Sequence, residues 1–200
     1  MWHLLERIIL KVKWILRKKN IPDIIEKREI IEYYRRLYKP CVFIETGTFL
    51  GDTVDFFKDK FDTIYSIELS EELAKKAKTR FYGNKNIKII QGDSADVLAS
   101  VMAEVNSQAL LWLDGHYSSE FYINDELVKT AKGARETPIE KELEVLLGSF
   151  VPQIILIDDA RLFTGNGDYP TVQFLKNIVK NSNASYEIFI RKDIIHIIPN

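Results

Sequence analysis

Three aspartates in the second half of the 200-residue chain follow apolar runs that should be buried. Asp114 comes directly after ALLWL, and Asp158 and Asp159 come directly after QIILI. Buried carboxylates need partners, so packing alone does not explain an acidic pair at this position. Oxygen ligands grouped in this way suit Mg²⁺ or another divalent cation, and the alternative is that one aspartate of the pair caps a turn.

A histidine stands close to the first of these aspartates. His116 is two residues beyond Asp114, in the sequence LDGHYS. An unperturbed histidine titrates near ~6.5 and can therefore accept a proton from a reacting hydroxyl. The sequence thus indicates a candidate general base, and the alternative is a histidine that only hydrogen-bonds a loop carbonyl.

Further side chains near these acids could bind an anionic substrate. Tyr117, Lys132 and Arg135 lie in segment 115–137, the longest stretch without clear periodicity. Arg161 follows the acid pair. Long loops inside compact domains are often lids or binding loops, and basic side chains hold phosphate or carboxylate groups. The alternative is that these basic residues are simply solvated.

A glycine-containing turn precedes all of these residues. The segment FIETGTFLGDT places Gly47 and Gly51 between an apolar run and a helical stretch. Glycine lets the backbone approach a ligand closely and adopt conformations that other residues resist. Phe49 stands where the dinucleotide fingerprint GxGxxG has glycine, which argues against a nicotinamide-dependent enzyme of the Rossmann type.

Polar residues also follow the second and third apolar runs. Glu68, at the end of TIYSIE, can accept hydrogen bonds from both ribose hydroxyls of an adenosine. Ser70 is at the same time a good N-cap for the helix that follows. In QGDSADVL, Asp93 or Ser94 either caps the next helix or lies beside an adenine ring, and the segment leaves both interpretations open.

Short apolar, β-branched runs alternate with helical stretches from residue 41 onward. This pattern predicts a parallel sheet covered by helices on both faces, with right-handed crossovers that give a doubly wound sandwich. Ligands bind such sheets at the carboxyl ends of the strands, where the acids and the glycine turn lie. The expected strands are 41–46, 63–68, 87–90, 109–114 and 153–158, and the expected helices are 52–59, 71–81, 94–105, 138–148 and 170–180.

The end of the chain departs from this alternation. YEIFIRK and IIHIIP are two expected strands that are joined only by a short turn at Lys192 and Asp193. So short a link permits an antiparallel hairpin and excludes a parallel crossover. The predicted fold class is therefore α/β, with a doubly wound, mostly parallel seven-stranded sheet, a C-terminal antiparallel hairpin and N-terminal helices.

Residues 1–40 are expected to form an N-terminal helical extension of a domain that spans 41–200. Residues 2–19 have the pattern of a basic amphipathic helix, and a second helix is expected at 24–38, after Pro22. The first helix is expected to pack on the domain or on a second subunit. The alternative is that it lies on an anionic membrane surface.

Composition and charge are those of an ordinary soluble protein, with 46% hydrophobic residues, and the lone cysteine fits the reducing cytoplasm. A formal net charge of −1 gives the chain as a whole no attraction to nucleic acid. Cys41 is the single cysteine and is expected to be a small core residue. No apolar stretch approaches the roughly 18–20 residues that span a bilayer.

Together, the motifs resemble those of the class I S-adenosylmethionine-dependent methyltransferases over residues 41–198. The resemblance rests on ETGTFLG, Glu68, GDS, LDGHYS and the terminal hairpin, in that order. It implies that ETGTFLG is the methionine-binding turn, that Glu68 binds the ribose and that GDS lies on the adenine side. The cofactor-binding residues that it implies are Glu45, Gly47, Thr48, Gly51, Glu68, Asp93, Ser94 and Asp114.

Within this class, LDGHYS paired with ILIDD is similar to metal-dependent sugar O-methyltransferases of the macrolide and aminocoumarin type. That resemblance implies that Asp114, Asp158 and Asp159 hold Mg²⁺ and that His116 acts with Asp114 in catalysis. His116 replaces the acidic residue that is common after DG in those enzymes. The segment TAKGARETPIEKEL also looks like methyltransferase-like proteins of bacterial surface-polysaccharide gene clusters.

The implied function is S-adenosylmethionine-dependent O-methylation of a sugar, a nucleotide sugar or another small hydroxylated acceptor, assisted by a divalent metal. One alternative is a non-catalytic module that binds S-adenosylmethionine, or nothing, and serves assembly or regulation. Such a module would be distinguished by an acceptor pocket that segment 115–137 blocks. The other alternative is the nicotinamide-dependent enzyme considered above.

Overall fold

A computed structural model describes residues 21–115, 120–123, 126–129 and 136–200 of the chain. The amphipathic helix predicted at 2–19 lies outside the described residues. Four of the predicted site residues also lie outside them, namely His116, Tyr117, Lys132 and Arg135.

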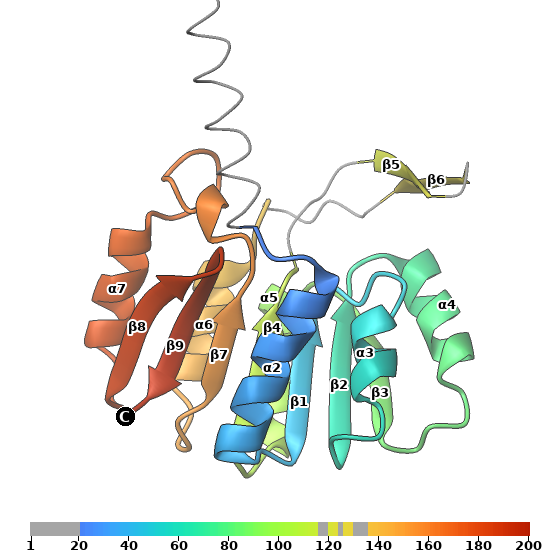
Figure 1. The fold of residues 1–200 in the computed structure, drawn as a ribbon, viewed down its shortest axis with the longest axis horizontal. Coiled ribbons are helices and arrows are strands. Elements are labelled where there is room, and N and C mark those ends of the chain that lie inside the picture. The colour runs from blue at the N-terminus through green and yellow to red at the C-terminus, as the bar shows by residue number, and fades with distance from the viewer. Residues whose placement is uncertain (1–20, 116–119, 124–125, 130–135) are drawn as a thin grey trace, which may run out of the picture.

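The main sheet has seven strands and confirms the predicted fold class (Figure 1). Its strands are β1 (Val42–Thr46), β2 (Thr63–Glu68), β3 (Ile87–Gln91), β4 (Ala109–Leu113), β7 (Ile154–Ile157), β8 (Tyr186–Arg191) and β9 (Ile194–Pro199). Their spatial order is β3-β2-β1-β4-β7-β9-β8. The first five of these are parallel, whereas β9 runs antiparallel to both β7 and β8. The C-terminal hairpin therefore forms as expected.

Helices pack on both faces of this sheet (Figure 1). Their bounds agree with the predicted ranges to within two residues at either end. They are α2 (Ile24–Tyr38), α3 (Asp52–Phe57), α4 (Glu71–Arg80), α5 (Ser94–Glu104), α6 (Ile139–Leu147) and α7 (Val172–Lys180). Among these helices, none combines the length and the apolar character that crossing a bilayer requires.

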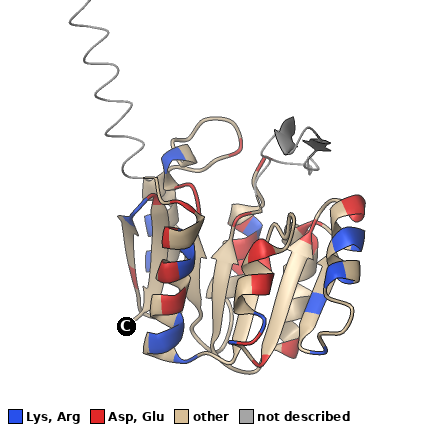
Figure 2. Ribbon diagram, turned by 45° about the vertical axis from the view of Figure 1, so that its right-hand side comes forward, with Lys and Arg blue, Asp and Glu red and all other residues tan. Residues whose placement is uncertain are grey.

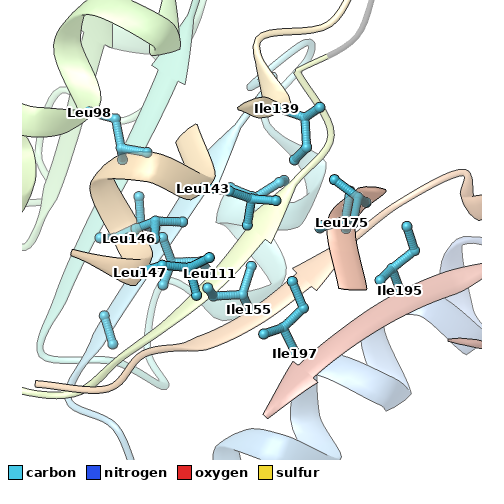
Figure 3. Packing of buried hydrophobic residues seen from close by; sticks show 14 of the residues in the cluster. Leu98, Leu111, Ile139, Leu143, Leu146, Leu147, Ile155, Leu175, Ile195 and Ile197 are labelled. Atoms are coloured by element: carbon cyan, nitrogen blue, oxygen red, sulfur yellow. The ribbon is translucent and has the colours of Figure 1, made fainter. Parts of the chain in front are cut away.

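Successive strand residues point to opposite faces and so enter two separate cores. Leu111 lies in one core with Ile155 and with Leu143 of α6 (Figure 3). Its neighbour Leu110 lies in the other core, together with Ile31 of α2. Burial on both faces explains why the strands read as continuous apolar runs. Charged residues are found mainly on the helices and connecting segments (Figure 2).

Segment 115–137 contains more structure than the sequence indicated. It includes an antiparallel hairpin of β5 (Glu120–Ile123) and β6 (Glu126–Lys129), which forms a sheet of its own. Strands of four residues are too short to display a recognisable period, so the sequence pattern did not reveal them.

The prediction that Cys41 is a core residue is wrong. Strand β1 begins one residue later, at Val42, and Cys41 is exposed. Its backbone carbonyl oxygen accepts hydrogen bonds from the amides of Asp62 and Thr63, at 2.9 and 3.2 Å. Cys41 therefore serves through its backbone, which joins the starts of the first two strands.

Candidate functional site

The glycine turn after β1 lies directly against the end of β4. Gly47 has φ +89°, and its amide donates a hydrogen bond to the Ile67 carbonyl oxygen at 2.8 Å. A Cβ atom at Gly47 would lie 2.6 Å from the backbone oxygen of Asp114. The turn therefore accepts no side chain at this position, and it brings the ends of β1, β2 and β4 together.

The same turn continues through a second strained stretch. Phe49 has φ +51°, and Gly51, the N-cap of α3, has φ +81°. A Cβ atom at Gly51 would approach the Phe81 ring to 2.8 Å. Phe49 thus adopts a left-handed conformation without being glycine, which requires outside support.

Glu68 supplies that support. Its carboxylate accepts the Phe49 amide at 2.8 Å through Oε2 and the Ser70 amide at 2.9 Å through Oε1. Burial raises the pKa of this carboxyl group, and the backbone hydrogen bonds oppose the rise. Because each carboxylate oxygen has two lone pairs, both oxygens keep capacity to accept further hydrogen bonds. Gly47, Glu68 and Asp114 thus share one edge of the sheet, as the sequence predicted.

The turn after β3 lies beside this edge. The Gly92 amide donates to the Glu68 carbonyl oxygen at 2.9 Å. Asp93 is the N-cap of α5, and its side chain accepts the Ala95 amide at 3.0 Å. Ser94 is buried. The capping interpretation of Asp93 is confirmed, while contact of Asp93 and Ser94 with an adenine stays a prediction.

Glu45 and Thr48 belong to a buried hydrogen-bonded chain beneath the turn. The Ser66 hydroxyl donates to Oε1 of Glu45 at 2.6 Å and lies 2.5 Å from the Thr48 hydroxyl. Glu45 is only 1% exposed. Burial raises the pKa of Glu45 to about 8, although its hydrogen bond to Ser66 opposes the rise. At neutral pH this side chain is therefore mainly a neutral acid that supports the turn from below.

The raised pKa of Glu45 makes stability depend on pH. The unfolded carboxyl ionises near its ordinary value of 4.5 and the folded one near 8, so the folded state holds the extra proton between these values. The free energy of unfolding then falls as pH rises through this window, by at most about 1.4 kcal/mol per pH unit for one group. Glu45→Gln should lose less stability than the wild type between about pH 6 and about pH 9.

Urea unfolding at the two pH values measures this difference. Glu144→Gln, at an exposed position of α6, is the matched control and should follow the wild-type profile. Parallel profiles for wild type and Glu45→Gln would show that Glu45 is not the neutral group we describe.

A second buried acid, Glu142 of α6, was missed by sequence reasoning. It is 2% exposed, and burial raises its pKa to about 7, while the nearby hydroxyls of Ser94 and Thr46 oppose the rise. Its Oε1 atom has no partner of standard hydrogen-bond geometry among the described residues. The signal was its place in IEKELEVLL, three residues after Ile139 on the apolar face of the helix.

The predicted acid cluster surrounds a lysine. Asp158, 3% exposed, forms an ion pair with the Nζ atom of Lys27 in the first turn of α2. Burial lowers the pKa of Lys27, but the negative charges of Asp158, Asp114 and Asp159 outweigh it and raise the pKa above its ordinary value. Burial and Asp114 raise the pKa of Asp158. The Asp158 amide donates to the Leu113 carbonyl oxygen at 3.0 Å, so Asp114 lies beside the acid pair that receives the Lys27 ammonium group.

Asp159 and Arg161 form a second ion pair next to the first. Asp159 has φ +56° and lies 2.5 Å from the Nη1 atom of Arg161. The same guanidinium pairs with Asp193 in the turn between β8 and β9. Arg161 was predicted to bind an anionic substrate, and it already contacts two carboxylates.

The side chains present do not fit a divalent metal. Asp158 and Asp159 have the cationic partners Lys27 and Arg161, respectively. Within residues 21–115, 120–123, 126–129 and 136–200, no three His, Cys, Asp or Glu side chains are arranged to hold a metal ion. The donor set instead suits an ammonium group, which needs hydrogen-bond acceptors rather than a complete coordination shell.

Comparison with solved structures supports the interpretation of the fold. No family model matches the sequence, and neither does any curated protein. The S-adenosylhomocysteine-bound methyltransferase PaMTH1 from Podospora anserina is similar with a TM-score of 0.57 and 15% identity, over 91% of this chain and 81% of that chain.

Two bacterial O-methyltransferases are similar to the same extent. TomG from Streptomyces achromogenes, in complex with S-adenosylmethionine, matches with a TM-score of 0.56 and 12% identity, over 90% of this chain and 82% of that one. An enzyme from Bacillus cereus, in complex with S-adenosylhomocysteine, matches with a TM-score of 0.54 and 13% identity, over 94% and 89%. The described part of this chain therefore has the fold of the class I S-adenosylmethionine-dependent methyltransferases.

Proposed function

We propose that this chain is an S-adenosylmethionine-dependent methyltransferase that acts on an oxygen of a sugar or another small hydroxylated acceptor. The observation that carries the proposal is the meeting of Gly47, Glu68 and Asp114 at one edge of the sheet. A glycine turn that tolerates no Cβ and a carboxylate with spare acceptor capacity match the needs of a nucleoside with a charged amino-acid tail.

Each part of this edge has a separate task in the proposal. The turn at Gly47 and Thr48 receives the methionine end of the cofactor, and Glu68 accepts the ribose hydroxyls. Asp93 and Ser94 lie on the adenine side. When bound, the cofactor supplies a methyl group on a positively charged sulfur. The protein contributes mainly alignment, because holding donor and acceptor in line can supply several kcal/mol of the barrier.

The acceptor hydroxyl must also lose its proton. In the proposed reaction the acceptor oxygen forms a bond to the methyl carbon, the carbon–sulfur bond breaks with its electrons staying on sulfur, and the hydroxyl proton passes to a base. We assign His116 as this base, since a histidine titrates in the right range. His116 lies outside the described residues, so this role rests on the sequence motif.

Several finer predictions are carried forward as parts of the proposal. The acceptor class rests on the resemblance of LDGHYS and ILIDD, and the binding of a phosphate or nucleotide-sugar carboxylate rests on Tyr117, Lys132 and Arg135. The contact of residues 2–19 with a second subunit or a membrane surface and the cytoplasmic location also stay predictions. Divalent-metal assistance is left out of the proposal, because Lys27 already pairs with Asp158.

Thermal unfolding with S-adenosylhomocysteine tests cofactor binding. At about 100 times its Kd, a ligand that binds only the folded state stabilises it by about 2.7 kcal/mol, which raises Tm by roughly 5–10 °C for a domain of this size. NADH should give no such rise. A larger shift with NADH would support the nicotinamide alternative instead.

Methyl transfer to an acceptor separates the enzyme from the non-catalytic alternative. The assay combines S-adenosylmethionine labelled in its methyl group with a panel of sugars and nucleotide sugars. It measures the labelled methyl group that becomes bound to an acceptor oxygen. Binding of S-adenosylhomocysteine without transfer to any member of the panel would favour an assembly or regulatory module.

A further inference from the structure

We propose that the Lys27 ammonium group is the resident cation of the acid cluster formed by Asp114, Asp158 and Asp159, and that it receives the acceptor oxygen in place of a divalent metal. The inference rests on the proposed function. It adds to that function a residue that binds the acceptor and a prediction that methyl transfer proceeds without metal.

The contacts of the cluster carry the first part of the argument. Lys27 pairs directly with Asp158, and the Asp158 amide donates to the Leu113 carbonyl oxygen at 3.0 Å, which places Asp114 next to this pair. Arg161 pairs with Asp159. A divalent ion on these carboxylates would either lie beside the two cations, which repel it, or displace one or both of them. Each displacement would leave a partly buried positive charge without its partner, which is costly.

The position of Lys27 on its helix carries the second part. Lys27 lies in the first turn of α2, where the amide of residue 27 donates to the Asp23 carbonyl oxygen at 2.9 Å. A positive side chain is unfavourable at a helix N-terminus because the helix dipole has its positive end there. The acid cluster offsets this cost, since it brings several negative charges to the same place. Lys27 is therefore held by tertiary partners rather than by its own helix.

Exposure shows how Lys27 could meet an acceptor. The Lys27 side chain is 21% exposed, whereas Asp158 is 2% exposed by its side chain. The ammonium group has three N–H donors and gives one of them to Asp158. A donor directed to an acceptor oxygen stabilises the negative charge that grows there as the proton leaves, and preorganised donors of this kind are effective in sites shielded from water.

Binding of Mn²⁺ alone is the direct test, and it needs no acceptor. Lys27→Met removes the charge and keeps the length of the side chain, so the three carboxylates lose their cation. We expect Lys27→Met to bind Mn²⁺ at least about tenfold more tightly than the wild type in calorimetry. The double variant Lys27→Met/Asp158→Asn should lose this gain. Tight Mn²⁺ binding by the wild type would overturn the proposal.

Turnover provides the second readout. Wild-type methyl transfer should be unchanged by EDTA, and Lys27→Met should lower kcat about 10²-fold while the Kd of S-adenosylhomocysteine changes less than twofold. Lys192→Met is the control, because Lys192 pairs with Glu26 in the same turn of α2 but lies outside the cluster. Should Lys27→Met fail to fold, the EDTA and Mn²⁺ measurements on the wild type still decide.

The two levels of the proposal can fail separately. Loss of turnover in EDTA, with S-adenosylhomocysteine still bound, would reject the role of Lys27 and leave the methyltransferase proposal standing. A wild type that binds no S-adenosylhomocysteine would reject the proposed function itself.

Discussion

Gly47→Val should abolish S-adenosylhomocysteine binding and lower the free energy of unfolding by several kcal/mol. Gly47 has φ +89°, a region that costs an L-residue roughly 1–2 kcal/mol. The added Cβ would meet the Asp114 backbone oxygen at 2.6 Å and the Asp114 carbonyl carbon at 3.1 Å. Backbone atoms cannot rotate away as a side chain can, so overpacking adds roughly 1–3 kcal/mol.

The loss of binding follows from the same geometry. A displaced turn at Gly47 moves away from the Ile67 carbonyl oxygen, to which its amide donates at 2.8 Å, and the end of β4 moves with it. Calorimetry with S-adenosylhomocysteine and urea unfolding measure the two effects. Gly83→Val is the matched control, because a Cβ there meets nothing within 4 Å. A Gly47→Val protein that binds S-adenosylhomocysteine like the wild type would remove the turn from the site.

The sheet and its helices could be predicted from the sequence because local signals and tertiary burial agree. Leu110 and Leu111 point to opposite faces of the sheet, and both are apolar because helices cover both faces. Helix starts were equally readable: Ser70 caps α4 by accepting the Leu73 amide at 3.3 Å. The short turn at Lys192 and Asp193 fixed the direction of the last strand in the same way.

The aspartates of the acid cluster could be predicted from the sequence, but its lysine could not. The aspartates were visible because charge directly after an apolar run is unusual. Lys27 was not, because a lysine in the polar part of a helix has the same local pattern whether it is solvated or buried. Its partner Asp158 is 131 residues away in the chain. Only the fold shows that helix α2 places the Lys27 ammonium group at the end of β7.

Glu142 and Cys41 show that residue type alone does not decide burial, since the acid is buried and the cysteine is exposed. Glu142 is an acid on a buried helix face, where its pKa rises to about 7 because of burial. Cys41 is apolar in type yet exposed, because the strand begins one residue after it. Residue type predicts burial only on average. Whether a particular residue is buried can depend on whether a strand begins one residue earlier or later.

Glu68→Ala should weaken S-adenosylhomocysteine binding at least about 10²-fold. The variant removes the carboxylate proposed to accept the ribose hydroxyls, and hydrogen bonds to a charged group contribute about 1.5–3 kcal/mol each. It also leaves the amides of Phe49 and Ser70 without the acceptors that now lie at 2.8 and 2.9 Å. Phe49 would then hold its left-handed φ of +51° without support, so the methionine end of the site loosens as well.

Graded variants separate the two roles of Glu68. Glu68→Gln keeps one accepting oxygen and should lose only about tenfold in affinity, because its amide nitrogen cannot accept from the backbone. Glu72→Ala is the control, since this exposed residue of α4 pairs with Lys76 and should leave the affinity unchanged. Calorimetry gives the affinities, and circular dichroism shows whether the sheet is intact. If Glu68→Ala bound S-adenosylhomocysteine as tightly as Glu72→Ala, the nucleoside could not lie on this carboxylate, and the edge that joins Gly47, Glu68 and Asp114 would have to serve another ligand.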